Sequence, residues 1–256
     1  MGGSDNQAAL VERQFGAQAA AYVASPVHAK GPDLDWLVER AAALRPARAL
    51  DLGTGGGHVA YALAPHADQV VACDLSPRML AAVAGTAARR GLANVDTEAC
   101  NAAALPFADA SFDFAASRYS AHHWGDLPGG LRECRRVLRP GATAIFMDAV
   151  SPGRPLLDTW LQGLELLRDP SHVRNPSTGE WGALLEAAGF DLLRVQRFDV
   201  RLDFASWIAR IGTPAVQADA IRALQRQAPA EVARHFDFGA DGSFTLNTAC
   251  FETVAA

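Results

Sequence analysis

Two aspartates separated by a glycine-rich turn are the residues of this chain whose types and spacing best fit ligand chemistry. Residues 49–52, Ala-Leu-Asp-Leu, form a short apolar run that ends in an acidic residue and continues into the glycine-rich segment 53–57. A second apolar run, residues 70–73, ends in Asp74. This order predicts a strand, a tight loop, a helix and a parallel strand, the unit that binds nucleosides at the carboxyl ends of its strands.

The side chains at this predicted edge favour a nucleoside that carries a positive charge. Gly53 and Gly55 let the backbone approach a ligand closely, because a Cβ would fill that space. Asp74 is placed to accept hydrogen bonds from the two hydroxyls of a ribose. Asp51 would repel a pyrophosphate but attract a cation. S-adenosylmethionine joins an adenosine ribose to an ammonium group and a sulfonium, and it is therefore the cofactor that these residues predict.

A nicotinamide dinucleotide is the competing ligand. Its fingerprint, Gly-x-Gly-x-x-Gly, needs a third glycine for close packing of the helix. Counted from Gly53 and Gly55, the third position is His58, so the pattern fails. An NAD(P)-dependent oxidoreductase is therefore the less favoured hypothesis.

Four segments, in order, resemble the motifs of the class I S-adenosylmethionine-dependent methyltransferases. They are residues 51–57, 74–80, 101–113 and 133–141. The third is similar to the adenine loop and fourth strand of the branch that includes the ubiquinone and menaquinone C-methyltransferases. The resemblance implies methyl transfer to a small-molecule acceptor, such as a quinone-like ring or a secondary metabolite. A noncatalytic S-adenosylmethionine-binding protein would use the same loop and stays an alternative.

The resemblance also assigns cofactor-binding roles. Asp51, directly or through water, and the backbone at Gly53, Thr54 and Gly55 would hold the methionine portion, and Asp74 the ribose. The remaining residues would border the adenine or the sulfonium, although Met79 fits ordinary core packing equally well; they are Leu75, Met79, Asn101, Ala102, Ala103, Ser117 and Arg118.

Asn101 departs from the family pattern. The family usually has an aspartate there, which accepts a hydrogen bond from the adenine amino group. The Asn101 side-chain oxygen can accept the same bond, and the backbone amide of Ala102 is the expected donor to the adenine ring. Turn formation or a helix cap is the alternative role for Asn101.

His122 and His123 follow the fourth expected strand and are the candidate catalytic residues. A neutral imidazole can take a proton near physiological pH, and a general base is needed only where the acceptor must lose one. A helix cap or a packed wall is the structural alternative. No metal site is predicted, because the cysteines form no C-x-x-C pair; they are Cys73, Cys100, Cys134 and Cys250.

Bulk properties exclude several function classes. The net charge of −5 does not suggest a nucleic-acid footprint. No apolar stretch is long enough to span a bilayer, and the polar amino terminus does not resemble a signal sequence. We expect a cytoplasmic protein, a monomer or homodimer, whose partner is a small-molecule substrate.

The expected fold class is α/β, with a Rossmann-like, doubly wound, seven-stranded and mostly parallel sheet, an antiparallel last strand and a helical lid. The single domain would comprise a helical cap (1–45), the cofactor-binding core (46–150), a linker with helices and strand six (151–202), a helical lid insert (203–238) and the last strand (239–256). Strands are expected at 47–52, 69–74, 94–99, 112–117, 142–149, 190–200 and 243–253. Helices are expected at 5–22, 33–44, 56–65, 77–90, 127–138, 155–168 and 181–188, with two or three more in 203–236.

Two weaker patterns concern the cap and the acceptor. Gln14, Phe15 and Gly16, followed by Tyr22 and His28, resemble the amino-terminal cap of the same branch. Arginines near the lid would suit an anionic acceptor, but surface arginines are common. Residues in the variable segments that could line an acceptor pocket, or simply form core, are Trp160, His172, Arg174, Trp181, Phe204, Trp207 and Arg210.

Overall fold

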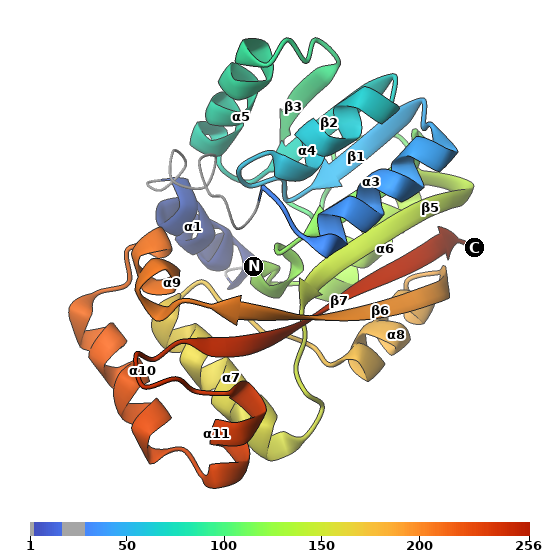
Figure 1. The fold of residues 1–256 in the computed structure, drawn as a ribbon. Helices are drawn as coiled ribbons and strands as arrows, with labels where there is room; N and C mark the ends of the chain where they lie inside the picture. Colours follow the sequence, from blue (N-terminus) through green and yellow to red (C-terminus); the bar gives the residue numbers. More distant parts are fainter. Residues whose placement is uncertain (1–2, 17–28) are drawn as a thin grey trace.

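The computed structural model describes residues 3–16 and 29–256, which form a central twisted sheet with helices on both faces (Figure 1). The strand order is β3-β2-β1-β4-β5-β7-β6. β7 runs antiparallel to β5 and β6, and the other pairs are parallel. The predicted fold class is therefore confirmed. The strands are β1 (Arg48–Leu52), β2 (Gln69–Asp74), β3 (Val95–Ala99), β4 (Phe112–Arg118), β5 (Leu138–Ala149), β6 (Phe190–Leu202) and β7 (Phe244–Ala255).

The helices follow the expected order between the strands. Of the first expected helix, residues 17–22 lie outside the described residues, as do Tyr22 and His28. The described helices are α1 (Gly3–Gly16), α3 (Pro32–Leu44), α4 (His58–Leu63), α5 (Pro77–Arg89), α6 (Leu127–Val137), α7 (Pro155–Arg168), α8 (Thr178–Ala187), α9 (Phe204–Ile211), α10 (Ala215–Gln227) and α11 (Ala230–Phe236), with 3₁₀ turns at η1 (Ala64–His66) and η2 (Ala121–His123).

The central strands are rich in apolar residues because both faces of the sheet are buried. Along β1, Leu50 and Leu52 belong to an apolar cluster with α6 and α8. Ala49 belongs to a second cluster with α3, α4 and α5 on the opposite face. The alternation of side chains along the strand thus divides its residues between two cores.

Two element starts differ from the predictions by three residues or more. α8 begins at Thr178 and not at 181, because Ser177 and Glu180 form a reciprocal capping box. β5 begins at Leu138 and not at 142, directly after α6. The predicted Pro140-Gly141 turn is instead an irregularity inside the strand, where Gly141 has φ +78° and the register with β4 shifts.

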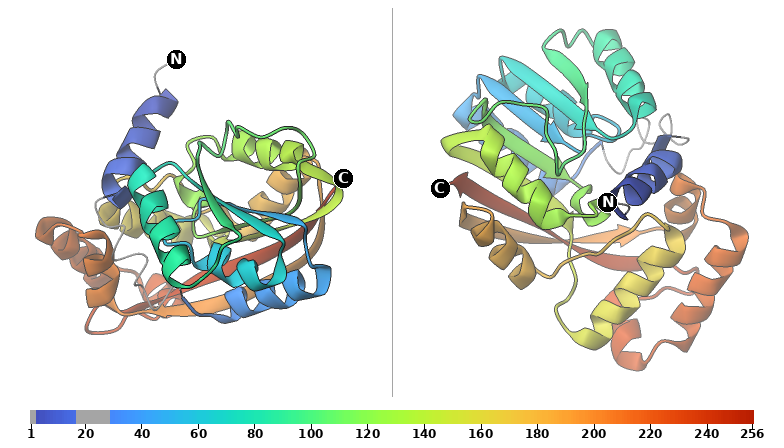
Figure 2. Two further views of the ribbon diagram at one scale, coloured as in Figure 1. Left: turned by 90° about the horizontal axis from the view of Figure 1, so that it is seen from above. Right: turned by 180° about the vertical axis from the view of Figure 1, so that it is seen from behind.

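The helices between β6 and β7 extend the fold at one end of the sheet (Figure 2). α9, α10 and α11 share an apolar cluster with α7 and the ends of β6 and β7. α9 also meets α1, since the Gln14 side-chain amide donates to the Ile211 carbonyl at 3.1 Å. The amino-terminal helix is therefore linked to the insert that the sequence predicts as a lid.

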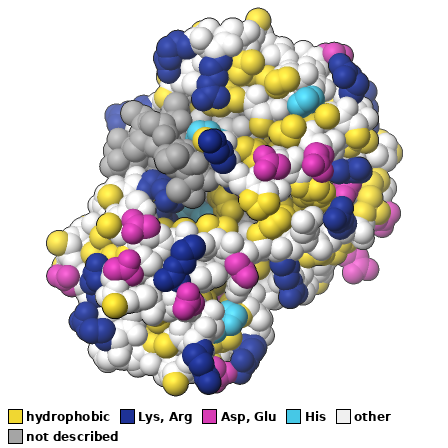
Figure 3. All heavy atoms as spheres, viewed as in Figure 1, with side chains coloured by type: hydrophobic (Ala, Val, Ile, Leu, Met, Phe, Trp, Pro, Cys, Tyr) yellow, Lys and Arg dark blue, Asp and Glu magenta, His cyan; other side chains and the backbone are white. Residues whose placement is uncertain are grey.

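The surface has no obvious single-sign region on the face drawn in Figure 3, where acidic and basic side chains are interspersed. Within the described residues, no helix has the length and apolar character needed to cross a bilayer.

The loop after β1 is tied to the end of β2 by its backbone. The amides of Gly53 and Thr54 both donate to the Cys73 carbonyl, at 2.9 and 2.7 Å. Gly53 has φ +75° and Gly55 has φ +49°, a region that disfavours a side chain. Of these two glycines, only Gly53 also lacks room for a side chain, because a Cβ there would lie 2.6 Å from the Ser120 Cβ.

We predict that Gly53→Ala destabilises the protein more than Gly55→Ala. Alanine is strained by the positive φ at both positions, but at Gly55 a Cβ would meet nothing within 4 Å. The extra loss at Gly53 should be about 1–3 kcal/mol in the free energy of unfolding, measured in urea. Equal losses would show that Ser120 moves aside at no cost.

Candidate functional site

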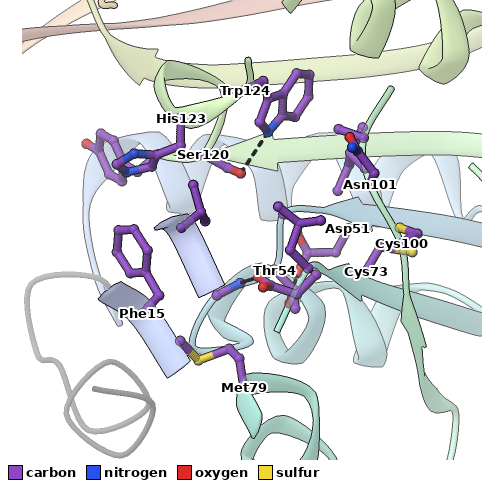
Figure 4. Close-up of a pocket in the computed structure, with 18 of the residues that line it drawn as sticks. Phe15, Asp51, Thr54, Cys73, Met79, Cys100, Asn101, Ser120, His123 and Trp124 are labelled. Carbon is purple, nitrogen blue, oxygen red and sulfur yellow. Dashed lines mark hydrogen bonds between the residues drawn. The ribbon is translucent and has the colours of Figure 1, made fainter. Parts of the chain in front are cut away.

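A cavity lies at the carboxyl ends of β1, β2, β3 and β4, closed on one side by α1 (Figure 4). It encloses about 1210 Å³ of empty space, including its open mouth. We call it the first cavity. It brings together most of the predicted site residues: Asp51, Gly53, Thr54, Gly55, Asp74, Leu75, Met79, Asn101, Ala102, Ala103, Arg118 and His123.

The Asp51 carboxylate is the most deeply buried charged group that lines the first cavity, with 1 % of the residue exposed. Its Oδ2 accepts hydrogen bonds from the Thr54 hydroxyl at 2.6 Å and from the Ala60 amide at 3.0 Å. Its Oδ1 is buried and has no partner among the described residues. Burial raises the pKa of Asp51 to about 7, against the opposing effect of these two hydrogen bonds. A cationic group at Oδ1 would supply the missing partner and favour the charged carboxylate.

Asp74 stands at the end of the neighbouring strand. Its Oδ2 accepts from the Gly55 amide at 2.9 Å, and its Oδ1 accepts from the Ser76 amide at 3.0 Å. Burial raises the pKa of Asp74, although these backbone hydrogen bonds oppose the shift. Each oxygen keeps a lone pair for a further donor, such as a hydroxyl group.

Asn101 makes the turn that the sequence left as an alternative to an adenine contact. Its side-chain oxygen accepts from the Ala103 amide at 3.0 Å. Asn101 also lines the first cavity, and its oxygen has a second lone pair. The two roles are therefore compatible.

Cys73 and Cys100, distant in the sequence, meet in this part of the first cavity (Figure 4). Their side chains share a hydrogen bond, which together with burial raises the pKa of Cys73. Both are free thiols. The cysteine spacing gave no indication of this contact.

The Arg118 side chain joins the end of β4 to the start of α3. Its Nε and Nη2 donate to the two carboxylate oxygens of Asp33, at 2.6 and 3.1 Å. Arg118 lines the first cavity, as predicted for a residue near a ligand, but Ser117 does not. Ser117 is buried, and its hydroxyl has no partner among the described residues. Sequence reasoning did not identify Asp33.

A second cavity adjoins the first and holds about 1120 Å³ of empty space, including its mouth. The two cavities share Phe15, Arg118, Tyr119 and His123. Tyr119 has φ +52° at this junction, a strained backbone of the kind that clusters at functional sites. Further lining comes from α7, β6, α9 and β7.

Of the variable-segment residues considered for an acceptor pocket, Trp207 and Arg210 line the second cavity. Trp181 and Phe204 are buried in the apolar clusters, and Trp160 packs against the cluster around α7. Arg174 pairs with Asp158 and Glu180, at 3.1 and 3.0 Å. The His172 side chain bonds Gln162 at 2.8 Å.

The adjacent histidines have different electrostatic environments. His122 lines only the second cavity, and its Nδ1 lies 2.6 Å from Asp148 Oδ1. Burial alone would lower the pKa of His122, but the charge of Asp148 and this hydrogen bond outweigh it, and the pKa is raised. The imidazolium form of His122 is therefore favoured more than it is in a free histidine.

His123 is held as a neutral ring. Its Nδ1 lies 3.2 Å from the Ser171 carbonyl, which only accepts and therefore favours the proton on Nδ1, and its Nε2 lies 3.8 Å from Asp169 Oδ2. Burial and the charge of His122 lower the pKa of His123 well below its usual value. The Phe15 ring packs edge-on against it at 4.8 Å. Of the two histidines, only His123 borders both cavities.

Comparison with known proteins gives a consistent picture. The family model described as a methyltransferase domain matches residues 50–146. The uncharacterised protein YafE of Escherichia coli K12 is 46% identical over 193 residues, which cover 75% of this chain and 93% of that protein. The ubiquinone/menaquinone biosynthesis C-methyltransferase of Desulfotalea psychrophila is 31% identical over 159 residues, covering 59% of this chain and 63% of that protein.

A relative of known structure matches over most of its length. The uncharacterised methyltransferase YcgJ of Bacillus subtilis is 36% identical over 204 residues, covering 80% of this chain and 81% of that protein. Its crystal structure superposes with a TM-score of 0.82 at 32% identity, over 87% of this chain and 97% of that one.

We predict that Asp51 makes stability fall as the pH rises. The folded protein keeps the Asp51 proton up to about pH 7, whereas the unfolded chain releases it near the ordinary pKa of 3.8. The free energy of unfolding therefore decreases across this window, and Asp51→Asn should remove that part of the decrease, roughly 2–4 kcal/mol between pH 4 and pH 7. Parallel pH profiles of the two proteins in urea unfolding would contradict this.

We predict that Asp148→Asn lowers the pKa of His122, because burial then acts without the opposing charge. In ¹⁵N spectra followed with pH, His122 of the native protein should titrate above the ordinary histidine pKa and His123 below it, and the variant should lose the rise at His122. Asp158→Asn, at a carboxylate that pairs with Arg174, is the control and should leave both titrations unchanged. A His122 that titrates below the ordinary histidine pKa in the native protein would refute the assignment.

Proposed function

Because this chain belongs to the methyltransferase family, we propose that it binds S-adenosylmethionine in the first cavity and methylates a small molecule held in the second. The Oδ1 of the buried Asp51 carries the proposal, since it is a carboxyl oxygen with no partner among the described residues and belongs to a residue that lines the cavity. The ammonium group of the cofactor has the charge and the donors to fill that position.

The other lining residues fit the remaining parts of the cofactor. Asp74 would accept from the ribose hydroxyls, and Leu75 and Met79 would flank the adenine. Asn101, Ala102 and Ala103 form the loop that would meet the adenine edge. When bound, S-adenosylmethionine supplies a methyl group already activated by a sulfonium. The chain therefore contributes binding, alignment of the acceptor and exclusion of water.

His123 is the residue that would hold a proton released by the acceptor. Its Nε2 carries a lone pair, and the ring borders both cavities. The positive charge of His122 would lower the pKa of His123 and so favour its neutral form. Such a base matters only for acceptors that lose a proton during transfer.

The walls of the second cavity favour a ring-containing acceptor. Phe15, Tyr119 and Trp207 supply aromatic surface, and Leu202 and Leu246 supply aliphatic surface. A relative named as a ubiquinone/menaquinone C-methyltransferase supports a quinone-like ring as one such acceptor. In this proposal α1, which lines the first cavity, and α9, which lines the second, form the lid; α10 and α11 brace it through α7.

We predict that Asp74→Ala weakens the binding of S-adenosylhomocysteine at least about tenfold in calorimetry, because charge-assisted hydrogen bonds contribute roughly 1.5–3 kcal/mol each. Asp96→Ala is the control, since Asp96 is exposed on β3 and lines neither cavity. Binding of NAD by the native protein without binding of S-adenosylhomocysteine would overturn the proposed function.

A further inference from the structure

Two residues of the described chain combine buried, unpaired side-chain polar atoms with a place in a cavity wall. One is Asp51 in the first cavity, and the other is Asn175 in the second. Asn175 is 1 % exposed, and neither its side-chain oxygen nor its side-chain nitrogen has a partner among the described residues. An unsatisfied buried amide is costly, so its retention points to a ligand that completes it.

The backbone of Asn175 is fixed by one neighbouring side chain. Gln162 on α7 donates to the Asn175 carbonyl at 2.9 Å and accepts from the Asn175 amide at 3.1 Å. The same Gln162 oxygen bonds His172 Nε2 at 2.8 Å, which fixes the orientation of the Gln162 amide. Asn175 is thus held from its backbone, and its side chain has no part in holding the loop.

Three of the arginines that line the second cavity have partners within the protein. Arg118 pairs with Asp33 at 2.6 Å and Arg201 with Asp237 at 2.8 Å. Arg168 donates to the Trp207 carbonyl at 3.1 Å, and its Nη1 lies 3.9 Å from Glu165. Burial raises the pKa of Glu165, which favours its uncharged form. These three arginines therefore have partners other than an acceptor, while Lys30 and Arg210 also line the cavity.

We propose that Asn175 is a specificity-determining residue of the acceptor site and binds a neutral group that both donates and accepts hydrogen bonds, a hydroxyl or a primary carboxamide. Either group can satisfy the side-chain oxygen and nitrogen of one amide together. This inference rests on the proposed function of the second cavity. Asn175 orients and selects the acceptor and takes no part in the chemistry.

The test uses four small aromatic probes of similar shape: phenol, benzamide, benzoate and toluene. Their dissociation constants are measured by NMR titration of the full chain saturated with S-adenosylhomocysteine. Phenol or benzamide should bind about three- to tenfold more tightly than toluene or benzoate. This difference in affinity corresponds to the net free energy of one or two hydrogen bonds. The tighter of the two tells whether the acceptor group is a hydroxyl or a carboxamide.

Asn175→Leu replaces asparagine by a side chain of similar shape and should abolish this preference. It should not lower the melting temperature, because the amide that it removes has no hydrogen-bond partner in the free protein. Asn175→Asp is the second variant; it loses the donor and should also lose the preference for benzamide. A preference retained in both variants, no preference in the native protein, or a melting temperature several degrees lower in Asn175→Leu would each overturn the proposal.

These experiments distinguish a failure of the Asn175 proposal from a failure of the proposed function. Failure of the native protein to bind S-adenosylhomocysteine would refute the proposed cofactor. Normal binding of S-adenosylhomocysteine with any of the contrary probe or stability results would refute only the role of Asn175.

Discussion

The burial of one carboxylate, that of Asp51, is the constraint on which the arrangement of the site depends. Taking a charged carboxylate out of water is costly unless hydrogen bonds or a cation compensate. Its Oδ2 finds compensation in Thr54 and Ala60, and those bonds fix the shape of the glycine loop and its junction with α4. Its Oδ1 has no such partner. The interaction that shapes the loop therefore also leaves an anionic position facing the first cavity.

The same loop connects Asp51 to the rest of the site. Its Gly55 amide donates to Asp74, and two of its amides donate to the end of β2. On the other side, Gly53 lies against Ser120, which belongs to the segment carrying Tyr119, His122 and His123. The two cavities meet at this segment. Cofactor binding in the first cavity and acceptor binding in the second are thus built on adjoining turns.

The sequence predicted the features that depend on neighbours along the chain. The order of strands and helices, the glycine loop and Asp74 all follow from local pattern and spacing, and the structure has each of them. α8 could also have been placed correctly, since the Ser177 and Glu180 capping pattern is visible in the sequence.

The features that the sequence did not reveal depend on contacts between distant segments. Asp33 meets Arg118 across 85 positions, and Asp148 meets His122 across 26. His122 and His123 look equivalent in the sequence and differ only because folding puts Asp148 beside one ring and Ser171 beside the other. Asn175 lies in an irregular loop with no motif, so only the cavity and the missing hydrogen bonds single it out.

Asp51 is a buried carboxyl group without a cationic partner. A measurement of its pKa by ¹³C NMR tests this assignment most directly. In the free protein the pKa should be about 7. Saturation with S-adenosylhomocysteine, which carries the ammonium group, should lower it by about two units or more, and 5′-methylthioadenosine, which has no amino-acid tail, should leave it nearly unchanged. An ordinary pKa in the free protein, or the same response to both ligands, would contradict the account.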